Sequence, residues 1–215
     1  MPNSPSDEAL LAVAERFARL SGDCGRVEQP GVDEVEEWQD FSGRETTNDQ
    51  LRIEDVIAAH KLGLNGSALH VGMGNSGFAQ RFSCHFVKIT GITIQQGEVR
   101  HARELELPGY EVVLANKYSP VLLRVIHGPF DVIVDNNPTS FCCCRRHLLA
   151  MMQNYVSLLA PGGVVLTDRK GLRWTTQPND PAWGVSLAEW TKIGAIFSLV
   201  PVTYTESVPG LRKQN

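Results

Sequence analysis

The chain has 215 residues, of which 42% are hydrophobic and 20% charged, a composition typical of one globular domain with a full core. Its net charge of -4 disfavours nucleic acid and anionic membrane surfaces as partners. No apolar run approaches the roughly 20 residues of a membrane helix, and the start "MPNSPSDEALL" is not typical of a signal peptide. Three of the five cysteines are adjacent, which indicates reduced thiols, so we expect a cytoplasmic protein.

The first 48 residues differ from the rest of the chain. Apolar residues recur at helical spacing over residues 7–20, which predicts a helix. Residues 21–47 are rich in turn formers and acidic residues, and their few apolar anchors include Trp38 and Phe41. We therefore interpret residues 1–48 as a helical and loop-rich extension and a candidate substrate lid, and residues 49–215 as the main domain.

Predicted strands and helices alternate through the main domain. The helices are expected at about residues 49–62, 77–81, 97–106, 120–125, 145–159 and 186–194. The strands are expected at residues 68–71, 86–94, 110–114, 130–134, 163–167 and 197–205, before a short tail. Because these strands are continuously apolar and do not alternate with polar residues, they predict a parallel sheet covered on both faces.

The stretch "ALHVGMGNSGFAQRF", residues 68–82, joins the first predicted strand to a helix through a glycine turn. In an open parallel sheet, ligands bind beyond the carboxyl ends of the strands, where glycine lets the backbone approach them closely. Gly72, Gly74 and Gly77 match the dinucleotide pattern G-x-G-x-x-G, which is a weak signal when it stands alone. The turn predicts a nucleotide-like ligand without naming it.

The end of the second strand, "ITGITIQQGEVRHARE", argues against a dinucleotide. An acidic residue at this strand end usually binds the ribose, but Thr93 stands at that position. Any ribose contact from this strand end would then be neutral, through Thr93 or the amides of Gln95 or Gln96.

Four segments in order resemble the successive motifs of class I S-adenosylmethionine-dependent methyltransferases. They are "ALHVGMGNSGFAQRF", "ITGITIQQGEVRHARE", "FDVIVDNNP" and "LLAPGGVVLTD", and the likeness covers about residues 50–205. It implies a doubly wound α/β fold with a mostly parallel seven-stranded sheet. It also implies S-adenosyl-L-methionine as the cofactor and methyl transfer to an oxygen or nitrogen of a small metabolite.

The resemblance also implies roles for individual residues. In the turn, Gly72, Gly74 and the backbone near Ser76 would face the methionine and ribose parts of the cofactor. At the end of the second strand, Thr93, Ile94 and Gln95 would border the ribose and the adenine, and Asn116, after the third strand, would contact the adenine amine. Asp135 and Asn136, at the end of the fourth strand, would face the sulfonium and the acceptor. His70 stands where the family usually has a carboxylate, and it is either a buried histidine bonded to backbone or a contact of the cofactor carboxylate.

Asp135 and His147 are the candidate catalytic residues, because a proton-bearing acceptor needs a base near the strand ends. A solvated helix face beside Arg145 and Arg146 is the alternative for His147. Asp168 could join Asp135 at a magnesium ion or cap a helix, and we favour no metal site. The spacing of "CCCRRH" does not suit zinc.

Three functions remain in view. A small-molecule methyltransferase is favoured. A repurposed member that binds the adenosyl cofactor or a partner without catalysis is the alternative, since His70 and Thr93 replace two expected carboxylates. An NAD(P)-dependent oxidoreductase fits less well, because Thr93 is not acidic.

Overall fold

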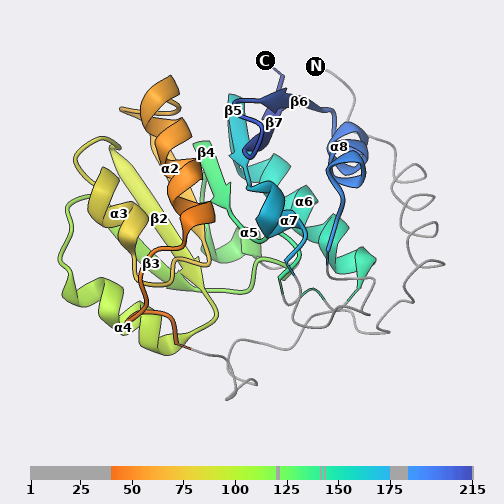
Figure 1. The fold of residues 1–215 in the computed structure, drawn as a ribbon. Helices are drawn as coiled ribbons and strands as arrows, with labels where there is room; N and C mark the ends of the chain where they lie inside the picture. The colour runs from red at the N-terminus through yellow and green to blue at the C-terminus, as the bar shows by residue number, and fades with distance from the viewer. Residues whose placement is uncertain (1–39, 120–121, 141, 143, 175–183, 215) are drawn as a thin grey trace.

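The computed structural model describes residues 40–119, 122–140, 142, 144–174 and 184–214. Its centre is a seven-stranded sheet in the order β3-β2-β1-β4-β5-β7-β6 (Figure 1). The strands are β1 Ser67–Val71, β2 Lys88–Thr93, β3 Tyr110–Leu114, β4 Phe130–Asp135, β5 Leu159–Leu166, β6 Leu199–Thr203 and β7 Pro209–Lys213. The first five are parallel, and β7 pairs antiparallel with both β5 and β6. The expected doubly wound, mostly parallel seven-stranded α/β fold is confirmed.

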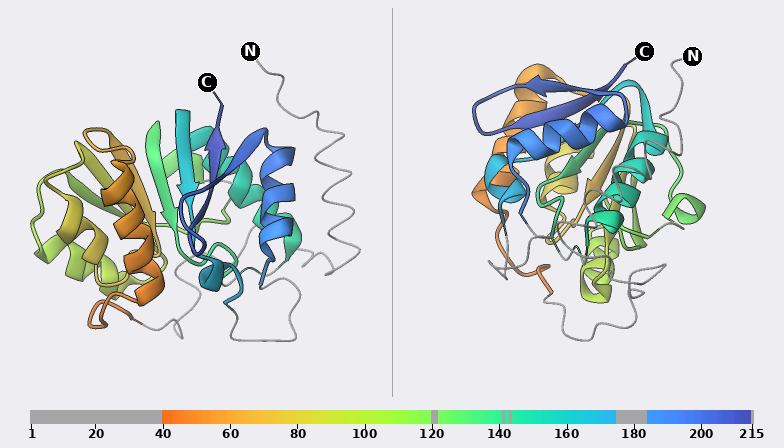
Figure 2. Two further views of the ribbon diagram at one scale, coloured as in Figure 1. Left: turned by 45° about the horizontal axis from the view of Figure 1, so that its top comes forward. Right: turned by 90° about the vertical axis from the view of Figure 1, so that its right-hand side faces the viewer.

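Helices cover both faces of this sheet, and Figure 2 shows α2 and α6 on opposite sides of it. The helices are α2 Asn48–His60, α3 Gly77–Phe82, α4 Gln96–Glu104, α5 Leu122–Val125, α6 Arg145–Leu158, α7 Arg169–Leu172 and α8 Leu187–Ile196. Neighbouring residues of β1 serve opposite faces: Ala68 packs with α2 and α3, whereas Leu69 packs with α5, α6 and α8. The continuous apolar strands of the sequence therefore reflect burial on both faces.

The structure corrects the end of the chain. We expected the last strands within residues 197–205 and a short tail after them, but the tail forms β7, which inserts between β5 and β6. Its sequence, "PGLRK", begins with Pro and Gly and gives little strand signal, although Leu211 is fully buried. The short helix α7 was also not expected.

Parts of the sequence-based interpretation fall outside the described residues. They include the helix over residues 7–20 and the anchor residue Trp38. Of the candidate lid, residues 40–48 are described, and most of them line the cavity treated below. None of the helices in the described ranges is both long and apolar enough to span a membrane.

Candidate functional site

A cavity of about 900 Å³ opens at the carboxyl ends of the parallel strands. The register aligns these ends, because Val71 of β1 pairs with both Ile92 of β2 and Asp135 of β4. The wall combines the strand ends with the segment before α2 and with the α7 region. From the strand ends come His70, Val71, Gly72, Met73, Gly74, Ile92, Thr93, Ile94, Gln95, Ala115, Asn116, Lys117, Asp135, Asn136 and Asn137.

The glycine turn leaves open space on its cavity side. Gly72 and Gly74 have φ of +69° and +50°, a backbone region that favours glycine. A Cβ on Gly72 would meet nothing within 4 Å, and a Cβ on Gly74 would meet only Phe41, at 3.7 Å. The Gly72 amide donates to the Ile92 carbonyl at 2.9 Å, which fixes the turn against β2. The turn is therefore a bare backbone cradle that a ligand can approach.

Ser76 supports this turn from behind. Its side chain is fully buried and does not line the cavity. Its hydroxyl shares a hydrogen bond of 3.0 Å with the Tyr110 hydroxyl, which also donates to the Met73 sulfur at 3.2 Å. Burial raises the pKa of Tyr110 to about 12, so the phenol stays protonated. The Ser76 side chain thus holds the turn in shape, and the structure gives it no place on the ligand side.

Glu98, in the first turn of α4, brings a carboxylate to the end of β2. It lines the cavity and accepts a 2.6 Å hydrogen bond from the Thr93 hydroxyl. Its other oxygen accepts from the Phe41 amide at 3.1 Å, which ties the segment before α2 to the site. Burial raises the pKa of Glu98, and the hydrogen bonds from Thr93 and Phe41 partly oppose this rise.

His70 lines the cavity as a neutral imidazole. Burial lowers its pKa to about 4, so it carries no charge at neutral pH. Its Nδ1 is buried with no hydrogen-bond partner among the described residues, and its ring lies 5.0 Å from that of Phe78. The structure does not show the backbone bond that was one expectation for His70. The other expectation, a cationic contact to a cofactor carboxylate, stays a prediction, because an adjacent carboxylate would itself raise the pKa of the imidazole.

Asp135 is held in a buried network. Lys117 Nζ donates to both carboxylate oxygens at 3.1 Å, and the Tyr155 hydroxyl donates to Oδ2 at 2.7 Å. Lys117 also donates to the Asn137 carbonyl at 2.7 Å. Burial lowers the pKa of Lys117, and the adjacent Asp135 opposes this. Asp135 lines the cavity as expected, but its oxygens are already engaged by a cation and a phenol, which is unfavourable for a general base.

Two amide side chains complete the wall near the ends of β3 and β4. The Asn116 Oδ1 accepts from the Tyr118 amide at 3.0 Å. The Asn136 Nδ2 donates to Asp49 Oδ2 at 2.9 Å, which joins the end of β4 to the start of α2. Both residues line the cavity, as do Ile94 and Gln95.

Comparisons of the structure find methyltransferases. NodS, an N-methyltransferase from Bradyrhizobium japonicum WM9 in complex with S-adenosyl-L-homocysteine, matches with a TM-score of 0.59 and 14% identity over 86% of this chain and 96% of that one. A SAM-bound amino pentose methyltransferase, CalS10 from Micromonospora echinaspora, matches with a TM-score of 0.59 and 14% identity over 84% of this chain and 99% of that one. An S-adenosylmethionine-dependent methyltransferase from Clostridium acetobutylicum ATCC 824 has a TM-score of 0.61 and 11% identity over 77% of this chain and 92% of that one.

This chain has the class I methyltransferase fold. No protein-family model matches the sequence, and a comparison with curated proteins finds no match.

Within this methyltransferase fold, two sequence-based candidates lie off the cavity wall. His147 is buried on α6, where its Nδ1 lies 3.2 Å from the Cys144 sulfur, so the structure does not support it as a catalytic base. Asp168 caps α7 by accepting from the Lys170 amide and pairs with Arg52 at 2.9 Å. Its capping role is confirmed, and this ion pair occupies the carboxylate that a shared metal would need.

Two further residues on the cavity wall, Glu98 and Lys117, were not expected from the sequence. Glu98 lies five residues beyond Thr93, where the first turn of α4 folds back toward the strand end. Lys117 directly follows Asn116, so its position after a strand was the available signal. Its partner Asp135 lies on β4, which is separated from β3 by two strands of the sheet, β2 and β1.

Proposed function

We propose that the protein is an S-adenosyl-L-methionine-dependent methyltransferase that modifies an oxygen or nitrogen of a small molecule. The observation that carries the proposal is the bare cradle at Gly72 and Gly74, which opens into a cavity of about 900 Å³. A cavity of this size is within the range of small-molecule sites and has room for a nucleoside cofactor beside a small acceptor. The methyltransferase fold supports this assignment.

The residues present fit the cofactor. The turn offers unobstructed backbone for the methionine part, and Ile94, Gln95 and Asn116 offer apolar and amide groups for the adenosine part. We propose Glu98 as the ribose acceptor in place of Thr93, because a carboxylate accepts hydroxyl hydrogen bonds more strongly than a neutral group. When bound, the cofactor supplies a methyl group made electrophilic by the sulfonium.

The chain's own contribution to catalysis is positioning. Methyl transfer is an in-line displacement, so a rigid wall that holds the acceptor close and aligned lowers the barrier. Lys117 and Asp135 line such a wall at the end of β4, and Tyr155 holds Asp135 from behind it through a hydrogen bond. We therefore assign Asp135 as a positioning residue. A neutral amine is nucleophilic without first losing a proton, so such an acceptor needs no base at this position.

The segment before α2 completes the enclosure. Asn75 donates to the Arg44 carbonyl at 2.8 Å, and the Phe41 amide donates to Glu98. These contacts place residues 41–50 along the cavity wall, so we propose that this part of the N-terminal extension covers the bound molecules and excludes water.

A cofactor-binding protein without transferase activity is the second candidate. Residues 70 and 93 are not acidic, and Lys117 neutralises Asp135, so the ends of β1, β2 and β4 themselves contribute little negative charge to the cavity. Such a site would bind S-adenosyl-L-homocysteine, which lacks the sulfonium charge, at least as well as S-adenosyl-L-methionine.

Titration calorimetry tests the proposal. We expect S-adenosyl-L-methionine and S-adenosyl-L-homocysteine to bind with one-site isotherms, and NAD not to compete with them. Absence of heat with both adenosyl compounds, or displacement of both by NAD, would contradict the proposal. Incubation with methyl-labelled cofactor and a panel of small amines, phenols and carboxylates then separates the two candidates, because only the enzyme transfers label.

A further inference from the structure

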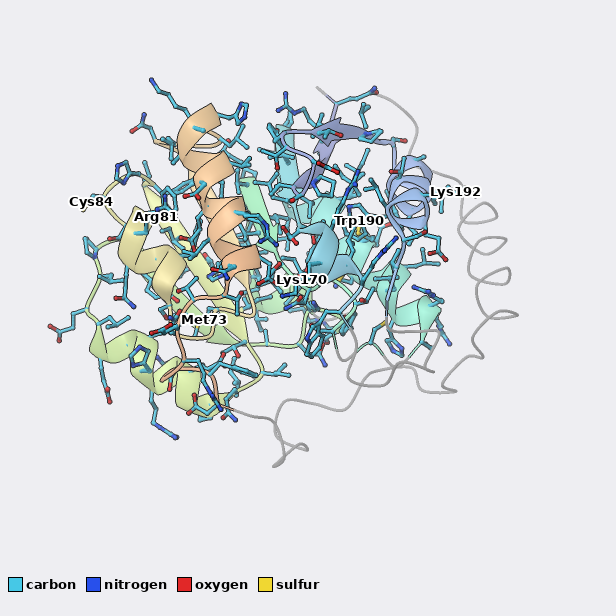
Figure 3. All side chains as sticks on the ribbon, in the orientation of Figure 1. Met73, Arg81, Cys84, Lys170, Trp190 and Lys192 are labelled. Carbon is cyan, nitrogen blue, oxygen red and sulfur yellow. The ribbon has the colours of Figure 1, made fainter. Side chains whose placement is uncertain are left out.

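A second hollow, of about 360 Å³, lies beside α7 and adjoins the main cavity. Arg169, Lys170, Leu172, Arg173 and Leu187 line it, and Lys170 lines the main cavity as well. Lys170 belongs to α7, and Figure 3 shows it near the middle of the molecule. The two spaces therefore share Lys170 in their walls.

Three side chains that line this hollow are cationic. Arg169, Lys170 and Arg173 are exposed, and within the described ranges none of them forms an ion pair. The nearby acids have other hydrogen-bond or ion-pair partners: Asp168 pairs with Arg52, and Glu189 bonds to Ser186 and faces Arg145. Asp49, which interacts electrostatically with Lys170, accepts a hydrogen bond from Asn136. In a chain of net charge -4, this concentration of positive charge is local.

The remaining lining is apolar. Leu172 is 1% exposed and anchored in the fold, since its amide donates to the Asp168 carbonyl and its carbonyl accepts from the Val185 amide. Leu187 begins α8. A hollow with a fixed apolar floor and three cationic side chains suits a small molecule that carries one compact anionic group.

We propose that this hollow binds an anionic group of the acceptor, a phosphate or a carboxylate, while the acceptor atom extends past Lys170 into the main cavity. This inference rests on the proposed function and names its substrate class. Guanidinium groups bind phosphate and carboxylate through paired hydrogen bonds, and lysine adds a mobile point charge. Nucleic acid is less suited, since its backbone calls for a longer basic surface than one hollow provides.

Direct anion binding tests the proposal. The probes are inorganic phosphate and succinate, titrated separately into the full chain at low ionic strength, with binding followed by calorimetry. We expect saturable binding of one or both, and the stronger of them identifies the group. The double variant Lys170→Ala/Arg173→Ala should weaken it by roughly tenfold or more. Lys192→Ala, which removes an exposed lysine on α8 (Figure 3), should leave it unchanged.

Three results would overturn the proposal. They are no saturable binding of either anion, an equal loss in Lys192→Ala, and tight binding of a single-stranded RNA of about 20 nucleotides that the double variant abolishes, because this would make the surface a nucleic-acid site. Titration of S-adenosyl-L-homocysteine into the same samples separates the two proposals. Adenosyl binding without anion binding defeats only this inference, and anion binding without adenosyl binding defeats the proposed function.

Discussion

The Thr93 hydroxyl donates a 2.6 Å hydrogen bond to Glu98, and this pair supplies a buried carboxylate at the end of β2. The strand end itself is neutral, so the acid comes from the first turn of α4. Because the second oxygen of Glu98 accepts from the Phe41 amide, one carboxylate joins β2, α4 and the segment before α2.

Glu98→Gln tests whether this carboxylate binds the ribose. An amide keeps the shape but accepts hydroxyl hydrogen bonds more weakly, so we expect about tenfold weaker binding of S-adenosyl-L-homocysteine. Calorimetry with adenosine and 2′,3′-dideoxyadenosine gives a second readout: the wild type should prefer adenosine, and the variant should lose most of that preference. A variant that discriminates as well as the wild type would show that Glu98 only braces the fold.

Gly72→Ala should remove adenosyl binding while the protein still folds. The new Cβ would occupy the open side of the cradle, and the φ of +69° adds strain of about 1–3 kcal/mol. Gly184→Ala is the matched control, because Gly184 has a φ of +70° and is not on the cavity wall. Urea unfolding should show similar stability losses for both, whereas calorimetry should show lost binding for Gly72→Ala alone. Equal affinities in the two variants would place the ligand elsewhere.

Lys117→Met should destabilise the protein strongly, by about 3–5 kcal/mol, because it leaves the buried Asp135 without its cation. Adding Asp135→Asn should recover at least half of this loss. Lys88→Met serves as the control, since Lys88 pairs with Glu111 at the surface, where such pairs contribute less than about 1 kcal/mol. Urea unfolding measures all three variants. A small effect of Lys117→Met, or no recovery in the double variant, would mean that the pair does not hold the wall.

Stability should fall below neutral pH partly through His70. Burial lowers its pKa from 6.5 to about 4, so the unfolded chain takes up a proton before the folded one does. Between about pH 7 and pH 5 this difference should lower the free energy of unfolding by about 2 kcal/mol. His70→Asn removes this contribution, so its free energy of unfolding should depend less on pH over that range. Identical pH profiles by urea unfolding would show that His70 is protonated alike in both states.

The local sequence was sufficient for most of the fold. Continuous apolar runs located β1 to β5, because burial on both faces of a parallel sheet demands them. Glycines at residues 72 and 74 located the turn, because the positive φ there favours glycine. The strand β7 was not predicted, because "PGLRK" has weak strand propensity. It is held by pairing with β5, which is distant in the sequence, and with β6, which precedes it across a turn.

The candidate site was determined only in part by sequence. Position after a strand correctly placed Thr93, Asn116, Asp135 and Asn136 on the cavity wall, because the carboxyl ends of parallel strands share one edge. The tertiary structure decided which of these side chains are already bonded within the protein and which can contact a ligand. Lys117 donates hydrogen bonds to the Asp135 carboxylate, 18 residues away in the sequence, and Glu98 accepts one from the Phe41 amide, 57 residues away. Sequence periodicity is set by neighbours a few residues apart, whereas such pairs form only when the folded sheet brings distant segments together.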